Sequence, residues 1–151
     1  MSTRERIAAD LKAALKARDK ARTSTLRLMQ AAFTERDILN RGTGKEAASE
    51  EEVLAILSKM VKSREESVRA FTEGGRPELA EIENAEIEII REYLPAAMSE
   101  AEAEEAVRAA IAKTGAASPR DMGAVMAALK AEHGGRMDFG RASGLVKQLL
   151  S

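Results

Sequence analysis

Residues 121–150 read DMGAVMAALKAEHGGRMDFGRASGLVKQLL, and this stretch predicts two short helices joined by a turn. Its apolar side chains recur at three- and four-residue spacing, which places them on one helix face. The first stripe is Met122, Val125, Met126 and Leu129, and the second is Phe139, Ala142, Leu145, Val146 and Leu149. Gly134 and Gly135 break the pattern between them, and Asp138 is a suitable cap for the second helix. The sequence therefore ends in a small helical unit with an arginine in its turn.

The rest of the chain also has the pattern of amphipathic helices. Ser-x-x-Glu capping boxes at Ser2, Ser49 and Ser99 mark three helix starts. The apolar spacing behind these and later starts predicts inward-facing side chains, among them Leu15, Leu28 and Ile82. No alternating β-branched run exceeds four residues, so strand signals are nearly absent. The predicted fold class is all-α.

Pro95 marks the best domain boundary in the sequence. Proline cannot continue a helix and disfavours helical geometry in the residue before it, so a helix should stop at Leu94. We expect residues 1–94 to form an antiparallel helical bundle, because their helices are long and their connections short. Residues 95–151 are expected to form a three-helix tail domain.

Composition removes several classes of protein and site. The chain has no cysteine, which excludes disulfides and thiolate metal sites. No apolar run approaches the roughly 18 residues needed to cross a bilayer, so we expect no membrane partner and a cytoplasmic location. No feature of the sequence sets an oligomeric state.

The charge is distributed unevenly although the net charge is only -1. Residues 1–41 contain ten basic and five acidic residues, residues 78–105 contain one basic and ten acidic, and residues 106–151 contain seven basic and three acidic. One interpretation is that these helix surfaces pair with each other, with Arg27 as one anchor. The other is that a basic end attracts a polyanion, and then Arg27 would bind a phosphate. In the N-terminal part, the strongest basic candidate is the row Lys12, Lys16 and Lys20 with Arg22 and Arg27 nearby.

No catalytic, cofactor-binding or metal-binding constellation stands out. A helical di-iron site needs two Glu-x-x-His pairs, whereas His133 is the single histidine of the chain. Glycine-rich phosphate loops are absent, since Gly42-Thr-Gly44-Lys45 has neither the spacing nor a preceding strand. The glutamates of residues 81–92 have the spacing of a solvated helix face. We expect His133 to be solvent-exposed near a helix end, and we expect no catalytic residue, cofactor or metal.

Four short motifs in order resemble the GatB/YqeY family over nearly the whole chain. They are Leu11-Lys-Ala-Ala-Leu-Lys-Ala-Arg-Asp19 with Arg22-x-Ser24-Thr-Leu-Arg27, then Glu92-Tyr-Leu-Pro95, Asp121-Met-Gly-x-Val-Met126 and Gly135-Arg-x-Asp138. The resemblance implies an all-helical, two-domain fold. It also implies a tail domain similar to that of the tRNA-dependent amidotransferase B subunit, which docks on the body of the tRNA. The family label is carbon–nitrogen ligase activity with glutamine as amido-N-donor.

Two positions depart from the family's tail pattern. Members commonly carry a lysine where this chain has Ala124, and another where it has Gly140. Both losses weaken a nucleic-acid interpretation, because each neutralised phosphate adds its own increment of affinity. The remaining candidates for nucleic-acid binding in the tail are Lys130, Arg136, Arg141 and Lys147. Since aromatic platforms are scarce, any RNA contact is expected to involve phosphate and shape.

Three hypotheses follow for the function. The leading one is a non-catalytic helical protein that associates with tRNA, or with an amidotransferase, through its tail. A second is a protein-interaction or accessory module that binds no nucleic acid. The acidic helix predicted over residues 78–94 is the observation that supports it. The third is an enzyme of amide transfer, which rests on the family label alone.

Overall fold

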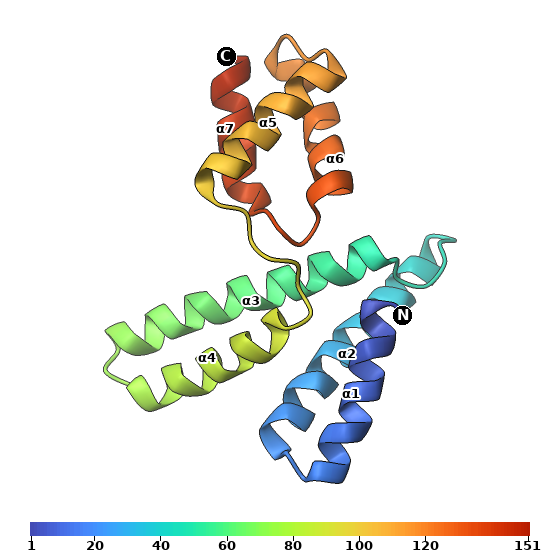
Figure 1. The fold of residues 1–151 in the computed structure, drawn as a ribbon, viewed down its shortest axis with the longest axis vertical. Helices are drawn as coiled ribbons and strands as arrows, with labels where there is room; N and C mark the ends of the chain where they lie inside the picture. The colour runs from blue at the N-terminus through green and yellow to red at the C-terminus, as the bar shows by residue number, and fades with distance from the viewer. The chain divides into compact units, whose positions relative to one another are not determined.

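The computed structural model describes residues 1–151 and consists of seven α-helices and one short 3₁₀ turn, with no strand (Figure 1). This confirms the predicted all-α class. The chain divides into two compact units, Met1–Leu94 and Pro95–Ser151, which we call the bundle unit and the tail unit. No helix is both long and apolar enough to span a membrane.

The bundle unit consists of two helical hairpins (Figure 1). Helix α1 spans Thr3–Ala17 and pairs with α2, Lys20–Gly42, and helix α3 spans Glu50–Glu73 and pairs with α4, Pro77–Arg91. The helices begin where the sequence predicts, because the caps are local. Ser49 and Glu52 form the complete reciprocal capping box, and Pro77 occupies the first turn of α4.

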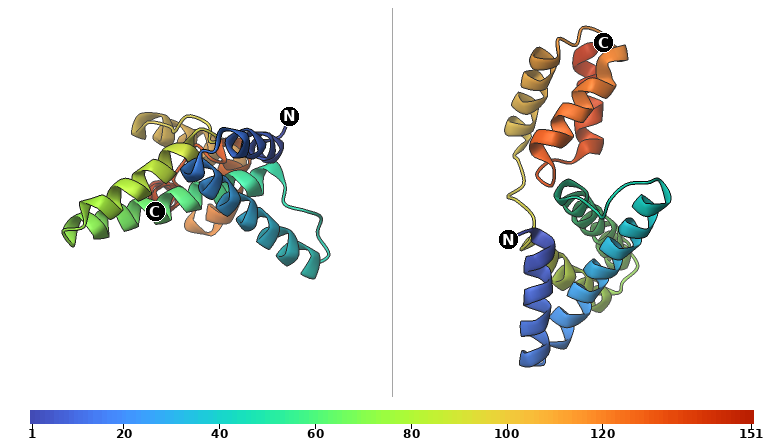
Figure 2. Two further views of the ribbon diagram at one scale, coloured as in Figure 1. Left: turned by 90° about the horizontal axis from the view of Figure 1, so that it is seen from below. Right: turned by 90° about the vertical axis from the view of Figure 1, so that its right-hand side faces the viewer.

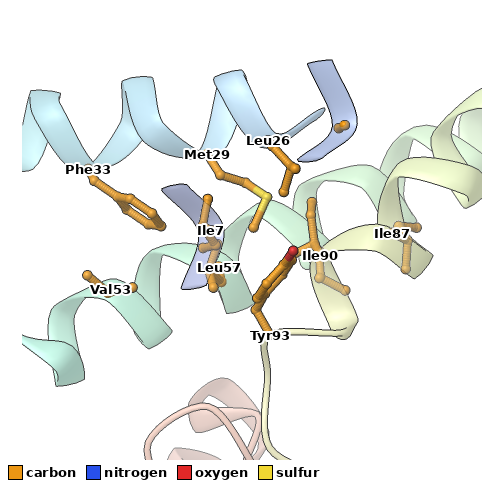
Figure 3. Packing of buried hydrophobic residues seen from close by; sticks show 11 residues of the cluster. Ile7, Leu26, Met29, Phe33, Val53, Leu57, Ile87, Ile90 and Tyr93 are labelled. Atoms are coloured by element: carbon orange, nitrogen blue, oxygen red, sulfur yellow. The ribbon is translucent and has the colours of Figure 1, made fainter. Parts of the chain in front are cut away.

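The core of the bundle unit is aliphatic, with one phenylalanine and one tyrosine (Figure 3). Side chains from all four helices meet in it. Fully covered members include Ile7 of α1, Leu26, Met29 and Phe33 of α2, Leu57 of α3 and Ile90 of α4. Tyr93, just after α4, is 3% exposed and closes one side.

Three residues that the apolar spacing places inside are on the surface instead. Leu15, Leu28 and Ile82 are 47%, 46% and 57% exposed. On α2 the buried stripe passes through Leu26, Met29 and Phe33 and then continues through polar residues, so Leu28 lies on the opposite side. On α4 the buried stripe passes through Ala80. Ile82 follows Ala80 by two residues, about 200° around the helix, and therefore lies on the outer face. At the end of α1, the small Ala14 is buried in place of Leu15.

The tail unit contains three helices around its own core (Figure 2). Helix α5 spans Glu100–Thr114, a 3₁₀ turn spans Pro119–Asp121, and α6 and α7 span Met122–His133 and Phe139–Leu150. The two helices predicted from residues 121–150 are therefore confirmed. Their buried side chains include Val125, Leu129, Ala142 and Val146, which pack with Val107 of α5.

Candidate nucleic-acid interface

Arg136 lies in the turn between α6 and α7 and holds the segment that leads into α5. Its carbonyl oxygen accepts a hydrogen bond from the Met98 amide at 2.9 Å, and its Nε donates to the carbonyl of Ala96 at 3.0 Å. The guanidinium also lies 3.7 Å from a carboxylate oxygen of Glu102. With its side chain 38% exposed, this arginine is engaged in the fold of the tail unit on three sides.

Arg141, in the first turn of α7, is far more exposed. Its guanidinium lies 3.5 Å from a carboxylate oxygen of Glu100, and the side chains are 78% and 94% exposed. Such an ion pair in water holds its partners only weakly. Glu100 and Glu102 both belong to the first turn of α5, so that turn brings Arg136 and Arg141 together.

Lys130 and Lys147 are arranged differently from the two arginines. Both are exposed, on α6 and α7, and neither contacts a carboxylate. Lys147 follows Arg141 by six residues, which is about 120° around the helix, so α7 presents them on different sides. The four candidates therefore comprise two arginines that pair with carboxylates of α5 and two lysines without a carboxylate partner.

Helices α6 and α7 and the turn between them contain few acidic groups, and each of these already has a hydrogen-bond partner. Helix α7 contains no acidic residue, and the single carboxylate of α6, Glu132, accepts a hydrogen bond from Lys113 at 2.5 Å. That ammonium lowers the pKa of Glu132. Asp138 caps α7 by accepting hydrogen bonds from the Gly140 and Arg141 amides. In all, residues 122–150 contain four basic residues against two acidic ones.

Arg120 is a further cation that the sequence did not single out. It lies in the 3₁₀ turn before α6, is exposed, and has no carboxylate partner. The signal for it in the sequence is Ser118-Pro119, a serine suited to cap a helix followed by a proline suited to its first turn, directly before Arg120.

His133 is not the solvent-exposed residue that the sequence predicts. Its side chain is only 21% exposed, and its Nδ1 is buried with no hydrogen-bond partner. The reason is the helix period, because His133 follows the buried Leu129 by four residues and shares its inner face. Nε2 lies 3.7 Å from Glu132. Nowhere do three or more His, Asp or Glu side chains gather in a group that could hold a metal ion.

In the bundle unit, acidic and basic helix faces do pair, but not through the anchor that we expected. Arg22 donates to Glu92 at 2.7 Å and to the Tyr93 hydroxyl at 3.0 Å, and Arg64 donates to Glu86 at 2.7 Å. Arg27 has no such partner, because it lies on the exposed side of α2. Internal pairing thus accounts for part of the charge pattern and leaves Arg27 free.

Comparison with known proteins assigns the chain to a family. Residues 4–150 match the model of the Yqey-like protein family. Two fungal relatives are each called altered inheritance of mitochondria protein 41, mitochondrial. The Clavispora lusitaniae protein is 38% identical over 94 residues, covering 60% of this chain and 52% of the relative. The Pyrenophora tritici-repentis protein is 30% identical over 110 residues, covering 70% and 58%.

The chain spans little more than half the length of these curated relatives. The family match, by contrast, runs through both units and through all seven helices. The chain therefore belongs to the YqeY-like protein family.

Proposed function

We propose that this protein is a cytoplasmic, non-catalytic partner of tRNA, or of a tRNA-dependent amidotransferase, and that its tail unit contacts the phosphate backbone. The observation that carries the proposal is the charge of α6 and α7. Helix α7 contains no acidic residue and Glu132 of α6 is bound by Lys113, so Lys130 and Lys147 are left uncompensated. Membership of the YqeY-like family adds support, because the tail motifs of this chain resemble the tail domain of the amidotransferase B subunit.

The proposed contact involves phosphates and shape, with no reading of bases. Phe139 is the single aromatic residue of the tail unit and packs against its core, so it offers no platform for stacking. Lysines act as mobile point charges that suit a phosphate backbone. Gly144 of α7, beside which a Cβ would meet open space, adds a low surface that a backbone can approach.

Arg136 and Arg141 can contribute to this contact only where phosphates compete with their carboxylate partners. Arg136 and Arg141 already lie near Glu102 and Glu100, so a phosphate has to replace those carboxylates before either arginine contributes fully. Since the pairs are exposed and lie at 3.5–3.7 Å, the exchange is energetically inexpensive. Binding of this kind is expected to be weak and to depend strongly on salt.

A salt titration of tRNA binding tests the proposal. Binding of the full chain to fluorescein-labelled tRNA is measured by anisotropy over a series of KCl concentrations. We expect Lys130→Gln with Lys147→Gln to weaken binding and to reduce the salt slope by about 0.7–0.9 for each lost contact. The matched control is Lys59→Gln with Arg69→Gln, which removes two exposed charges from α3. No binding at the lowest salt, or an equal effect of both double variants, would reject the proposal.

A second candidate, a protein-interaction module, rests on a different observation. Ile38 and Leu39, at the C-terminal end of α2, are 60% and 58% exposed. Neighbouring apolar residues with this exposure are typical of protein contacts. A pull-down with nuclease-treated extract, compared between the wild type and Ile38→Ser with Leu39→Ser, tests it. Loss of one defined partner in the variant supports this candidate, and identical recovery contradicts it.

A further inference from the structure

A hollow that is open to solvent lies beside the turn between α1 and α2 in the bundle unit. The hollow has a volume of about 620 Å³ and is lined by Leu15, Arg18, Lys20, Thr23, Ser24, Arg27 and Leu28. That volume lies within the range of small-molecule sites, roughly 300–1,000 Å³. Its lining combines three cations, two hydroxyls and two leucines, and contains no acidic residue.

The cations of this hollow are free, which distinguishes them from their neighbours. Arg18, Lys20 and Arg27 are exposed and have no carboxylate within reach. Arg22, on the other side of α2, is instead bound by Glu92 and Tyr93. Asp19 lies between Arg18 and Lys20 in the sequence, but its side chain caps α2 through the Arg22 amide and lines a separate, smaller hollow. The positive charge around the larger hollow is therefore not neutralised from within the unit.

Local geometry directs these groups to one place. Lys20, Ser24 and Arg27 lie four and seven residues apart at the start of α2, so they share one helix face. Arg18 has a left-handed backbone with φ of 56°, which ends α1 and turns the chain back. Together these features favour an anion carrying more than one negative charge.

Two exposed leucines in the hollow indicate that its ligand has an apolar part in addition to the anionic group. Leu15 and Leu28 are the two residues of α1 and α2 that apolar spacing places in the core and that the fold leaves about half exposed. Both line the same hollow as the three cations. A bare phosphate ion would leave them uncovered, whereas a phosphate ester with an apolar body would cover them.

We propose that this hollow binds a phosphate ester of nucleotide size. Arg18, Lys20 and Arg27 hold the phosphate, with the Ser24 hydroxyl as an additional donor. The organic part of the ligand lies on Leu15 and Leu28. This site is separate from the proposed tRNA contact and is formed entirely by the bundle unit.

The test is an NMR titration of the full ¹⁵N-labelled chain with AMP, inorganic phosphate and adenosine as probes. We expect AMP, at up to about 10 mM, to shift the amides of residues 18–28 and the Nε signals of Arg18 and Arg27. Inorganic phosphate should bind more weakly at the same signals, and adenosine should leave them unchanged. Arg27→Gln should weaken AMP binding by about tenfold, because a charge-assisted contact is lost.

Two matched variants separate this site from general charge and from folding. Arg69→Gln removes an exposed arginine of α3 outside the hollow and should leave AMP binding unchanged. Leu28→Ala should weaken AMP binding while leaving inorganic phosphate binding intact, and a thermal melt of each variant confirms that it is folded.

Several results would overturn the site. One is an AMP response that is the same in the wild type and in Arg27→Gln, and another is no response to AMP or phosphate at all. A third is a glutamate- and leucine-rich helical peptide that shifts residues 18–28 when AMP does not, which would make the hollow a protein-docking site. Lys130→Gln with Lys147→Gln should not affect AMP binding. The AMP titration therefore tests this site even if the protein does not bind tRNA.

Discussion

Arg4 and Asp37 form a two-pronged ion pair that joins the start of α1 to the last third of α2. The guanidinium nitrogens of Arg4 donate to the two carboxylate oxygens of Asp37 at 2.9 and 2.7 Å. One of these oxygens also accepts a hydrogen bond from the Ala48 amide at 2.8 Å. Arg4 and the Ala48 amide together lower the pKa of Asp37 from 3.8 to about 2.

Asp37→Asn is expected to destabilise the bundle unit in a pH-dependent way. The pKa of Asp37 is lower in the folded chain, so its contribution is complete above the unfolded pKa and is lost as the pH falls towards the folded one. The difference in free energy of unfolding between wild type and variant should be constant above about pH 5, should shrink below pH 4 and should vanish near pH 2. Urea unfolding at several pH values measures it. Glu35→Gln, an exposed carboxylate of the same helix, should show no such trend.

Tyr93 provides a second pH-dependent contribution, of opposite sign. Its hydroxyl donates to Asp10 at 2.5 Å and accepts from Arg22 at 3.0 Å. Burial, followed by the bond to Asp10, raises the pKa of Tyr93 to about 12. A raised pKa means that stability is complete below pH 10 and is lost as the pH approaches 12.

Since Tyr93 is the single tyrosine, ultraviolet absorbance follows its ionisation without interference. We expect a midpoint near 12 in the folded protein and near 10 in urea. Tyr93→Phe should lower the free energy of unfolding by about 1–2 kcal/mol at neutral pH. A native midpoint at the ordinary value of 10 would contradict the hydrogen-bond network.

Helix starts could be predicted from the sequence because the interactions that make them are local. Ser49 reaches its partner Glu52 within one turn, and Asp138 reaches the amides at the start of α7. The inner face of α2 was harder to predict, since it ends in Asp37 and Asn40. These polar residues are buried by partners on other parts of the chain, including Arg4 and Glu52. A search for apolar spacing cannot find such a stripe and selects Leu28 in its place.

In the candidate interface, too, local patterns predict which residues are exposed but not which partners they have. The exposure of Lys130 and Lys147 follows from the helix period, because each lies one residue, about 100°, after a buried member of the apolar stripe, Leu129 and Val146. The partners of Arg136 and Arg141 do not follow from any local pattern, since Glu102 and Glu100 belong to another helix. Which cations remain free is decided by tertiary packing.

The contrast between Leu26 and Leu28 can be measured directly. Leu26 is fully covered in the bundle core, so Leu26→Ala should lower the free energy of unfolding by about 2–5 kcal/mol. Leu28 is 46% exposed, and Leu28→Ala should change it by no more than about 0.5 kcal/mol. Chemical denaturation of both variants tests this. Similar losses would mean that the face of α2 is assigned wrongly.

Two glycines of the tail unit should respond to alanine in opposite directions. A Cβ at Gly144, inside α7, meets open space, so Gly144→Ala should stabilise the tail by about 0.5–1 kcal/mol. Gly115 ends α5 with φ of 70°, where a side chain is strained, so Gly115→Ala should destabilise it by about 1 kcal/mol. Thermal melts of the full chain provide the comparison. Stabilisation by both substitutions would contradict the left-handed end of α5.

Removing the carboxylates that hold the two tail arginines is expected to strengthen tRNA binding. In Glu100→Gln with Glu102→Gln, neither arginine faces a negative charge, and Arg136 keeps its position through the bond to Ala96. Glutamine can also preserve the contact with Ser99 at the start of α5. Because two exposed competing pairs are removed, we expect affinity to rise about three- to tenfold and the salt slope to steepen.

The control for this double variant is Glu81→Gln with Glu88→Gln, which removes two exposed carboxylates from α4 and changes the net charge equally. Anisotropy titrations with labelled tRNA compare the two. A rise confined to the α5 variant assigns the effect to Arg136 and Arg141. An equal rise in both would show that net charge alone controls binding, and a loss in the α5 variant would show that these carboxylates support the binding surface.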